Sequence, residues 1–123
     1  MRKREQGSRS IATAEPPSLD LIFDLLSNRR RRYTLYCLSE QVDGVAAVDE
    51  LVDAVVRLEA EAEDVSREFD EHRKTVRAEL RHSHLPKLAD TSLLEHDRRS
   101  ETVRYWNQPS LEEWLEHAKH KEL

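Results

Sequence analysis

Glycine and cysteine are almost absent from this chain: its 123 residues include two glycines and one cysteine. A single cysteine, Cys37, excludes a disulfide within the chain and a metal site built from several cysteines. We expect Cys37 to be a small buried apolar residue. No apolar run approaches the ~18 residues that a membrane-spanning helix needs. The basic residues 2–4 precede no apolar stretch, so we expect no secretory signal and a cytoplasmic protein.

Lysine is also scarce, with five lysines against 15 arginines, and the 25 acidic residues leave a net charge of −5. We expect an acidic surface with few lysines in a protein that stays soluble in concentrated salt, where charges are screened within about 3 Å at 1 M. Under such screening a net negative charge does not exclude nucleic acid as a partner. The length allows one domain with a modest core.

Apolar residues recur with helical spacing over much of the chain, but residues 1–17 lack this spacing. We predict a disordered basic tail there, for which plain solvation is favoured over contact with phosphates. A short helix capped by Ser18 is expected to follow. Its buried face is predicted to carry Leu19, Ile22, Phe23 and Leu26.

Two more helices are predicted before residue 59. Asn28 can cap the first, and Asp49 can cap the second, because each precedes a run of apolar residues at helical spacing. The pair Asp43-Gly44 between them indicates a turn. The acidic stretch 59–71 is predicted to be a solvated connection.

The next helix is expected to be capped by Ser66. Pro86 lacks an N–H, so this helix should kink or restart near 82–85. Two short runs, 93–97 and 102–106, then indicate a hairpin, because the second is rich in β-branched and aromatic residues.

The predicted order is four helices, a hairpin and a final helix, which is a mainly α fold with a small β-hairpin. Three helices followed by a two-stranded wing form a winged helix-turn-helix unit. We therefore predict such a domain over 18–107, after the tail of 1–17, and a separate C-terminal helix over 108–123.

Cations gather beside the apolar face of the helix that follows the acidic connection. At about 100° per residue, Phe69, Val76 and Leu80 share one stripe, and the adjacent stripe is cationic. Arginine can bond guanine edges through two nitrogens, and lysine acts as a point charge. The alternative for these cations is a solvated helix face. The predicted DNA contacts on this helix are Arg73, Lys74, Arg77 and Arg81.

Two other basic segments are candidate DNA contacts. Arg98 and Arg99 lie at the predicted hairpin tip, which suits phosphate or minor-groove contact. Arg30 and Arg31 belong to a run of four arginines at a helix N-terminus, where positive charge is unfavourable and a compensating anion is expected. This anion is either a DNA phosphate or an internal carboxylate. The internal candidates are Asp20, Asp24 and the acids of 59–71.

The last helix is predicted to begin with a capping box formed by Ser110 and Glu113. Its apolar face either joins two copies of the chain, which would give a homodimer on two DNA half-sites, or packs on the chain's own body. The residues of this predicted dimer interface are Leu111, Trp114, Leu115 and Ala118.

Metal and catalytic chemistry find little support in the sequence. His117 and His120 share a helix face, but no third ligand accompanies them, so we predict no metal site. The chain has no Gly-rich phosphate loop and no nucleophile elbow, and it has no paired carboxylates against an apolar pocket. We therefore predict no enzymatic activity, no cofactor and no small-molecule substrate.

Two stretches carry a resemblance to a known family. Residues 25–33, read as LLSNRRRRY, and 84–90, read as HLPKLAD before a hairpin, are similar to a winged helix-turn-helix domain family of halophilic archaea. The resemblance covers about residues 18–106. It implies a winged-helix fold, a cytoplasmic setting and a role in transcription, and it implies no ligand, operator or catalytic residue.

The sequence thus favours a sequence-specific DNA-binding regulator of transcription. The alternative is a winged-helix module that binds another protein and does not read DNA. The two hypotheses differ in what they require of Arg73, Arg77 and Arg81. Arginines occupied by neighbouring carboxylates favour the interaction module, and arginines exposed beside Arg98 and Arg99 favour DNA.

Overall fold

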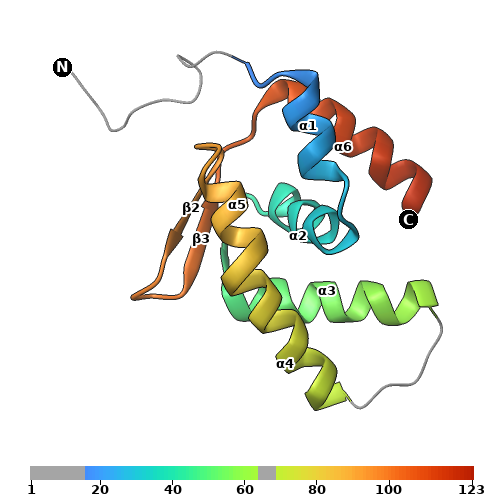
Figure 1. Ribbon diagram of the computed structural model, residues 1–123, viewed down its shortest axis with the longest axis vertical. Coiled ribbons are helices and arrows are strands. Elements are labelled where there is room, and N and C mark those ends of the chain that lie inside the picture. Colours follow the sequence, from blue (N-terminus) through green and yellow to red (C-terminus); the bar gives the residue numbers. More distant parts are fainter. Residues whose placement is uncertain (1–15, 64–68) are drawn as a thin grey trace.

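The computed structural model describes residues 16–63 and 69–123 (Figure 1). This part of the chain is mainly helical and carries one small antiparallel sheet, which confirms the mainly α prediction with its β-hairpin. None of its helices is both long enough and apolar enough to cross a bilayer. The elements are α1 (Leu19–Leu26), α2 (Arg29–Glu40), β1 (Val45–Ala47), α3 (Val48–Glu63), α4 (Phe69–Glu79), η2 (Leu80–His84), α5 (Leu85–Ala89), β2 (Leu94–Asp97), β3 (Thr102–Tyr105) and α6 (Pro109–Glu122).

The sheet has the strand order β1-β3-β2, and both pairs are antiparallel. The predicted hairpin is β2–β3, but β1 was not predicted from the sequence. It is three residues long, too short to show an alternating pattern, and it is held by pairing with the distant β3. Gly44 precedes it with φ +74°, and its carbonyl accepts a hydrogen bond from the Tyr105 amide at 2.8 Å.

The helix caps agree with the sequence at α1 and α2. The side chains of Ser18 and Asn28 accept hydrogen bonds from the third residue beyond each of them, at 3.1 and 3.0 Å. The predicted cap Asp49 is wrong: α3 begins at Val48, so Asp49 lies inside the helix, and the Glu50 carboxylate accepts from the Ala47 amide at 2.8 Å. The early start follows from β1, which delivers the chain directly into α3.

The predicted capping box of Ser110 and Glu113 is also wrong. Gln108 is the N-cap of α6, and its side-chain oxygen accepts from the Leu111 amide at 2.8 Å. Gln108 is itself buried, so the cap forms inside the fold, where its position depends on the preceding strand.

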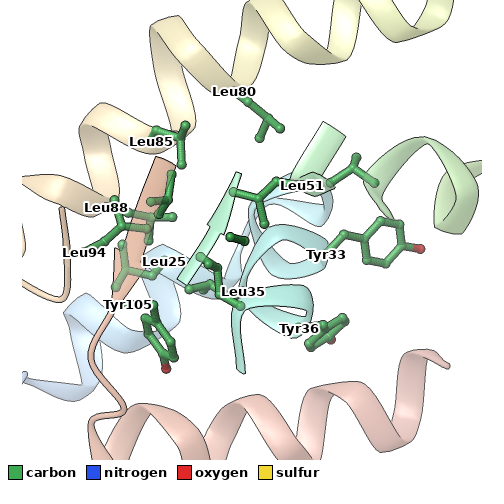
Figure 2. Close-up of a cluster of buried hydrophobic side chains, with 14 of the residues drawn as sticks. Leu25, Tyr33, Leu35, Tyr36, Leu51, Leu80, Leu85, Leu88, Leu94 and Tyr105 are labelled. Atoms are coloured by element: carbon green, nitrogen blue, oxygen red, sulfur yellow. The ribbon is translucent and has the colours of Figure 1, made fainter. Parts of the chain in front are cut away.

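Helix α2 lies at the centre of the core, and the other helices and the sheet pack around it (Figures 1 and 2). On α1 the predicted buried face is only partly correct. Ile22 is buried as predicted, and Leu25, which was not predicted to be buried, is buried with it. Leu19 and Phe23 are 54% and 49% exposed. The core occupies the side of α1 that faces α2, where Ile22 and Leu25 are buried three residues apart and Leu26 is partly buried.

The acidic connection differs from its prediction at its beginning. Helix α3 continues to Glu63, and Glu59 is buried. Residues 64–68, which include the predicted cap Ser66, lie outside the described residues, as does most of the predicted tail, 1–15.

The predicted kink before Pro86 is confirmed. Residues 80–84 form a π-helical turn in which the Leu85 amide bonds to the Leu80 carbonyl, five residues earlier. A proline ring displaces the carbonyl four residues before it, and the wider turn accommodates that displacement. Helices α4 and α5 therefore form one bent run beside the hairpin (Figure 1).

Candidate nucleic-acid interface

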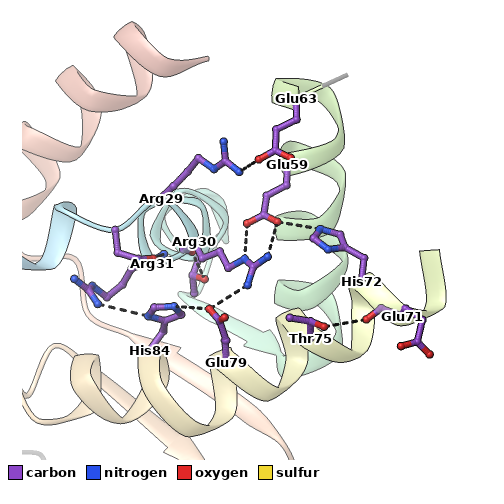
Figure 3. Close-up of polar contacts among 12 residues, drawn as sticks. Arg29, Arg30, Arg31, Glu59, Glu63, Glu71, His72, Thr75, Glu79 and His84 are labelled. Carbon is purple, nitrogen blue, oxygen red and sulfur yellow. Dashed lines mark hydrogen bonds and ion pairs between the residues drawn. The ribbon is translucent and has the colours of Figure 1, made fainter. Parts of the chain in front are cut away.

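The four arginines that open α2 are bonded inside the molecule. Arg30 bonds to both carboxylate oxygens of Glu59, at 2.6 and 3.1 Å, and its remaining nitrogen lies 3.0 Å from Glu79 (Figure 3). Arg29 pairs with Glu63 near the end of α3 and lies over the ring of Tyr33. Both contacts draw α2 toward α3, and the Glu79 contact adds α4.

Arg31 and Arg32 bond to the end of α1. Arg31 donates to the carbonyls of Leu25 and Asp24 at 2.8 and 2.7 Å, and Arg32 donates to the Leu26 carbonyl at 2.6 Å. The last turn of α1 contains no basic residue of its own, so these guanidiniums supply the positive charge that favours a helix C-terminus. Arg32 also bonds to both oxygens of Glu122 on α6, each at 2.8 Å.

These contacts correct the predicted site at Arg30 and Arg31. Arg31 is 7% exposed, and in both residues all three guanidinium nitrogens have partners within the chain. We therefore remove both from the predicted DNA contacts. The compensating anion is the internal alternative, Glu59 from the 59–71 acids, together with the carbonyl of Asp24.

Glu59 connects three helices from a buried position. It is 3% exposed, and besides Arg30 it lies 3.0 Å from Nε2 of His72 on α4. Sequence reasoning missed it because the surrounding acids are exposed. The available signal was its spacing: Glu59 falls one turn beyond Val55 and Val56 on the buried side of α3.

His84 is buried in the π-helical turn, close to this network. Its Nδ1 lies 3.5 Å from Arg31, and its Nε2 lies 3.6 Å from Glu79 (Figure 3). Burial lowers the pKa of His84 below its ordinary 6.5, and the positive charge of Arg31 lowers it further, while Glu79 opposes both effects. The neutral ring can accept from Arg31, so His84 joins the helical run α4–η2–α5 to α2 as an uncharged group.

Helix α4 presents the predicted apolar and cationic stripes. Val76 and Leu80 are fully buried, as predicted, and the side chain of Phe69 lies outside the described residues. The cations are partly exposed, from 26% for Arg73 to 78% for Lys74. Each lies beside a carboxylate. The pairs are Arg73–Asp53 at 2.8 Å, Arg77–Asp49 at 2.5 Å, Arg81–Glu101 at 3.3 Å and Lys74–Glu71 at 4.0 Å.

The hairpin turn is ordered by its own residues and exposes two arginines. One carboxylate oxygen of Asp97 accepts from the amides of Arg99 and Ser100, at 3.0 and 3.4 Å, and these bonds lower the pKa of Asp97. Arg98 and Arg99 are exposed. Within residues 16–63 and 69–123, neither side chain has an ion-pair partner. The turn thus holds two guanidiniums toward solvent.

Glu101 fixes this turn against the bent helical run. It adopts φ +54°, which is uncommon for a residue with a side chain. Its carboxylate lies 3.3 Å from Arg81 and 3.4 Å from His96, and its carbonyl accepts from the Val48 amide at 2.9 Å. The hairpin, η2 and the start of α3 therefore meet at one residue.

The arginines fall into two groups by how many nitrogens they use. Arg30, Arg31 and Arg32 each engage three nitrogens. In contrast, within the described part of the chain Arg73, Arg77 and Arg81 each meet a carboxylate through one nitrogen. A partly exposed pair that uses one nitrogen is weak, so its guanidinium can change partners at low cost.

Of the predicted dimer residues on α6, some lie in the interior and one lies at the surface. Leu111 and Leu115 are 0% and 2% exposed within the chain's own core, and Ala118 packs against that core. This is the packing alternative, so Leu111 and Leu115 are not available to a second copy, and Ala118 is only partly exposed. Trp114 is 36% exposed and meets the edge of the Phe23 ring, with centroids 5.2 Å apart.

No metal centre appears among residues 16–63 and 69–123, because no three His, Cys, Asp or Glu side chains there are arranged to hold an ion. Cys37 is partly buried against the core, and burial raises the pKa of its thiol.

Comparison with known proteins gives one match. The family described as Domain of unknown function (DUF7344) matches residues 23–104, which is 82 of the 123 residues. The matched region begins on α1 and ends on β3, so it contains α2, the bent helical run and the hairpin turn. No curated protein and no solved structure matches the chain.

Replacement of Glu59 by alanine should strongly destabilise the fold. It leaves the partly buried Arg30 without its two-point partner, and loss of one member of a buried pair costs about 3–5 kcal/mol. The matched control is Glu40→Ala, which removes a carboxylate that is 61% exposed and should cost at most about 1 kcal/mol. Urea unfolding of both variants measures the difference. An equal loss in the free energy of unfolding for the two variants would show that Glu59 contributes no more to stability than an exposed carboxylate.

Acidification should weaken the fold through His84. Its folded pKa lies below the unfolded value of about 6.5, so the unfolded chain binds the proton first and the free energy of unfolding falls as the pH drops below that value. Above pH ~6.5 His84 is neutral in both the folded and the unfolded chain, so it does not lower the free energy of unfolding there. Urea titrations at pH 7.5 and 5.5 should show a smaller loss for His84→Gln than for the parent. The same loss in both proteins would remove His84 as the cause.

Proposed function

The chain belongs to the DUF7344 family, and we propose that it is a cytoplasmic, sequence-specific DNA-binding regulator of transcription with a winged helix-turn-helix fold. The order of its elements supports this assignment of the fold. The chain has a helix, a short strand, two helices and a hairpin, with the first strand paired to the last, and this order favours a winged helix. In this proposal α4–η2 is the recognition helix and β2–β3 is the wing.

The contact between Arg81 and Glu101 is the observation that carries the proposal. It brings the bent helical run against the hairpin turn, and in this proposal the cations of both elements form one surface. The hairpin extends beside the helical run on the side away from α6 (Figure 1). A recognition helix in a major groove needs a neighbouring wing that reaches the adjacent backbone, and this surface offers both parts.

The contact set that we propose is narrower than the sequence suggested. Arg73, Lys74, Arg77 and Arg81 face the groove, and Arg98 and Arg99 contact phosphate or the minor groove. The partners Asp49, Asp53 and Glu101 hold three of the arginines until DNA replaces them. Because each such pair is partly exposed and uses one guanidinium nitrogen, the exchange to a phosphate or a guanine edge is inexpensive.

Salt limits how this surface can work. About six phosphate contacts give a slope near −5 in log K against log salt, so a tenfold rise in salt costs roughly five decades of affinity. A protein suited to concentrated salt therefore has to rely on base-edge bonds and close fit as well as on charge.

The second candidate is a winged-helix module that binds another protein. The specific observation in its favour is that all four cations of the α4 stripe already lie beside carboxylates. If those pairs persist, the surface is close to neutral and suits a polar protein partner better than a phosphate backbone.

Selection of duplexes from a random library, at 0.2 M and at 2 M KCl, tests the proposal. The parent should enrich a defined sequence. On that duplex, Arg77→Ala or Arg81→Ala should cost about 1–3 kcal/mol of binding, or roughly 5- to 150-fold. The double change of Arg98 and Arg99 to alanine should lower the salt slope by about 2.

Lys119→Ala is the matched control, because it removes one positive charge from α6 and should leave the affinity unchanged. A parent that binds duplexes with no sequence preference, or not at all, would refute DNA reading and favour the interaction module.

A further inference from the structure

The junction of α1 and α6 exposes a cluster of large apolar side chains. Leu19 and Phe23 lie one turn apart on α1, and Trp114 of α6 packs its ring against Phe23. Their exposed fractions are 54%, 49% and 36%. Among the described residues, three of the five exposed large hydrophobic side chains therefore gather at this one place. A grouped apolar surface of this kind is typical of an interaction site.

The charge on the outer face of α6 changes sign along the helix. Glu113, His117 and Lys121 follow one another at intervals of four residues, so they form one line along the helix, and all three are exposed. The line is acidic near the start of α6 and basic near its end. Glu116 and His120 flank it with the same polarity.

We propose that this α1–α6 face binds a second copy of the chain, with the two α6 helices antiparallel and crossing at His117. A two-fold interface repeats each contact, because residue i meets residue j and j meets i. Antiparallel helices that cross at His117 place Glu113 opposite Lys121 of the second copy, and Trp114 opposite its His120. The apolar cluster then lies beside two equivalent ion pairs.

Charge decides the orientation. In a parallel pair Glu113 would face Glu113 and Lys121 would face Lys121, and like charges across an interface are unfavourable. In the antiparallel pair both contacts are between Glu113 of one copy and Lys121 of the other, which attract each other. The same face that no other part of the described chain covers is thus complementary to itself.

The proposed dimer leaves the DNA-binding surface unobstructed. Helix α6 and α1 lie together at one end of the molecule, while α4 and the hairpin turn lie away from them (Figure 1). The proposal keeps Trp114 from the predicted interface and drops Leu111, Leu115 and Ala118, which pack on the core, and it does not depend on DNA binding.

Sedimentation equilibrium of the full chain tests the dimer without any DNA. At 0.2 M KCl the parent should reach twice its 14.4 kDa mass. Glu113→Lys and Lys121→Glu should each raise the dissociation constant about tenfold, because two like-charge contacts replace two ion pairs. The double variant, Glu113→Lys with Lys121→Glu, should restore the constant to within about threefold of the parent, and at 2 M KCl the single variants should approach the parent.

Trp114→Ala should weaken the dimer at both salt concentrations, with Val42→Ala as the control for an exposed apolar residue elsewhere. Far-UV circular dichroism checks that each variant is folded. A parent that stays monomeric to about 1 mM would overturn the proposal. So would a dimer that the charge reversals leave unchanged, because the antiparallel pairing predicts their effect and its reversal in the double variant.

Discussion

The basic first turn of α2 is the constraint on which the rest of the structure depends. Successive residues of a helix point about 100° apart, so four adjacent arginines together reach four neighbouring helices. Arg29 and Arg30 bind α3, with Arg30 reaching α4 as well, while Arg31 binds the end of α1 and Arg32 binds both α1 and α6. Positive charge at a helix N-terminus is unfavourable, and the carboxylates of Glu59, Glu63 and Glu122 compensate it. One short segment thus joins every helix that surrounds it.

This arrangement also determines which cations remain for a partner. The run of four arginines is the longest basic run in the sequence, yet three of its members engage all their guanidinium nitrogens internally. The cations of the α4 stripe and the hairpin turn are spaced more widely along the chain, and their guanidiniums are less engaged. Charges that use all their nitrogens within the chain hold the fold together, and partly exposed charges with one contact can exchange partners. The proposed functions of the two groups follow from that difference.

The sequence predicted the parts of the fold that local chemistry determines. Ser18 and Asn28 cap their helices as expected, Pro86 disrupts its helix, and Val76 and Leu80 face the core. The sequence did not predict the features that depend on contacts between distant segments. Strand β1 exists because β3 pairs with it, Gln108 caps α6 because the sheet positions it, and Glu59 is buried because Arg30 and His72 meet it there. In the candidate site the stripe of Arg73, Arg77 and Arg81 was found by helical angle, whereas its partners Asp49, Asp53 and Glu101 come from elements whose placement the sequence did not reveal.

The most direct test of the account is a map of amide chemical shifts as a selected DNA duplex is added to the isotope-labelled protein. The account predicts that the changes concentrate on α4–η2 and on the turn that holds Arg98 and Arg99, and that Arg30 and Arg31 change little. Changes concentrated on residues 29–32 or along α6, with α4 and the hairpin turn unaffected, would contradict it.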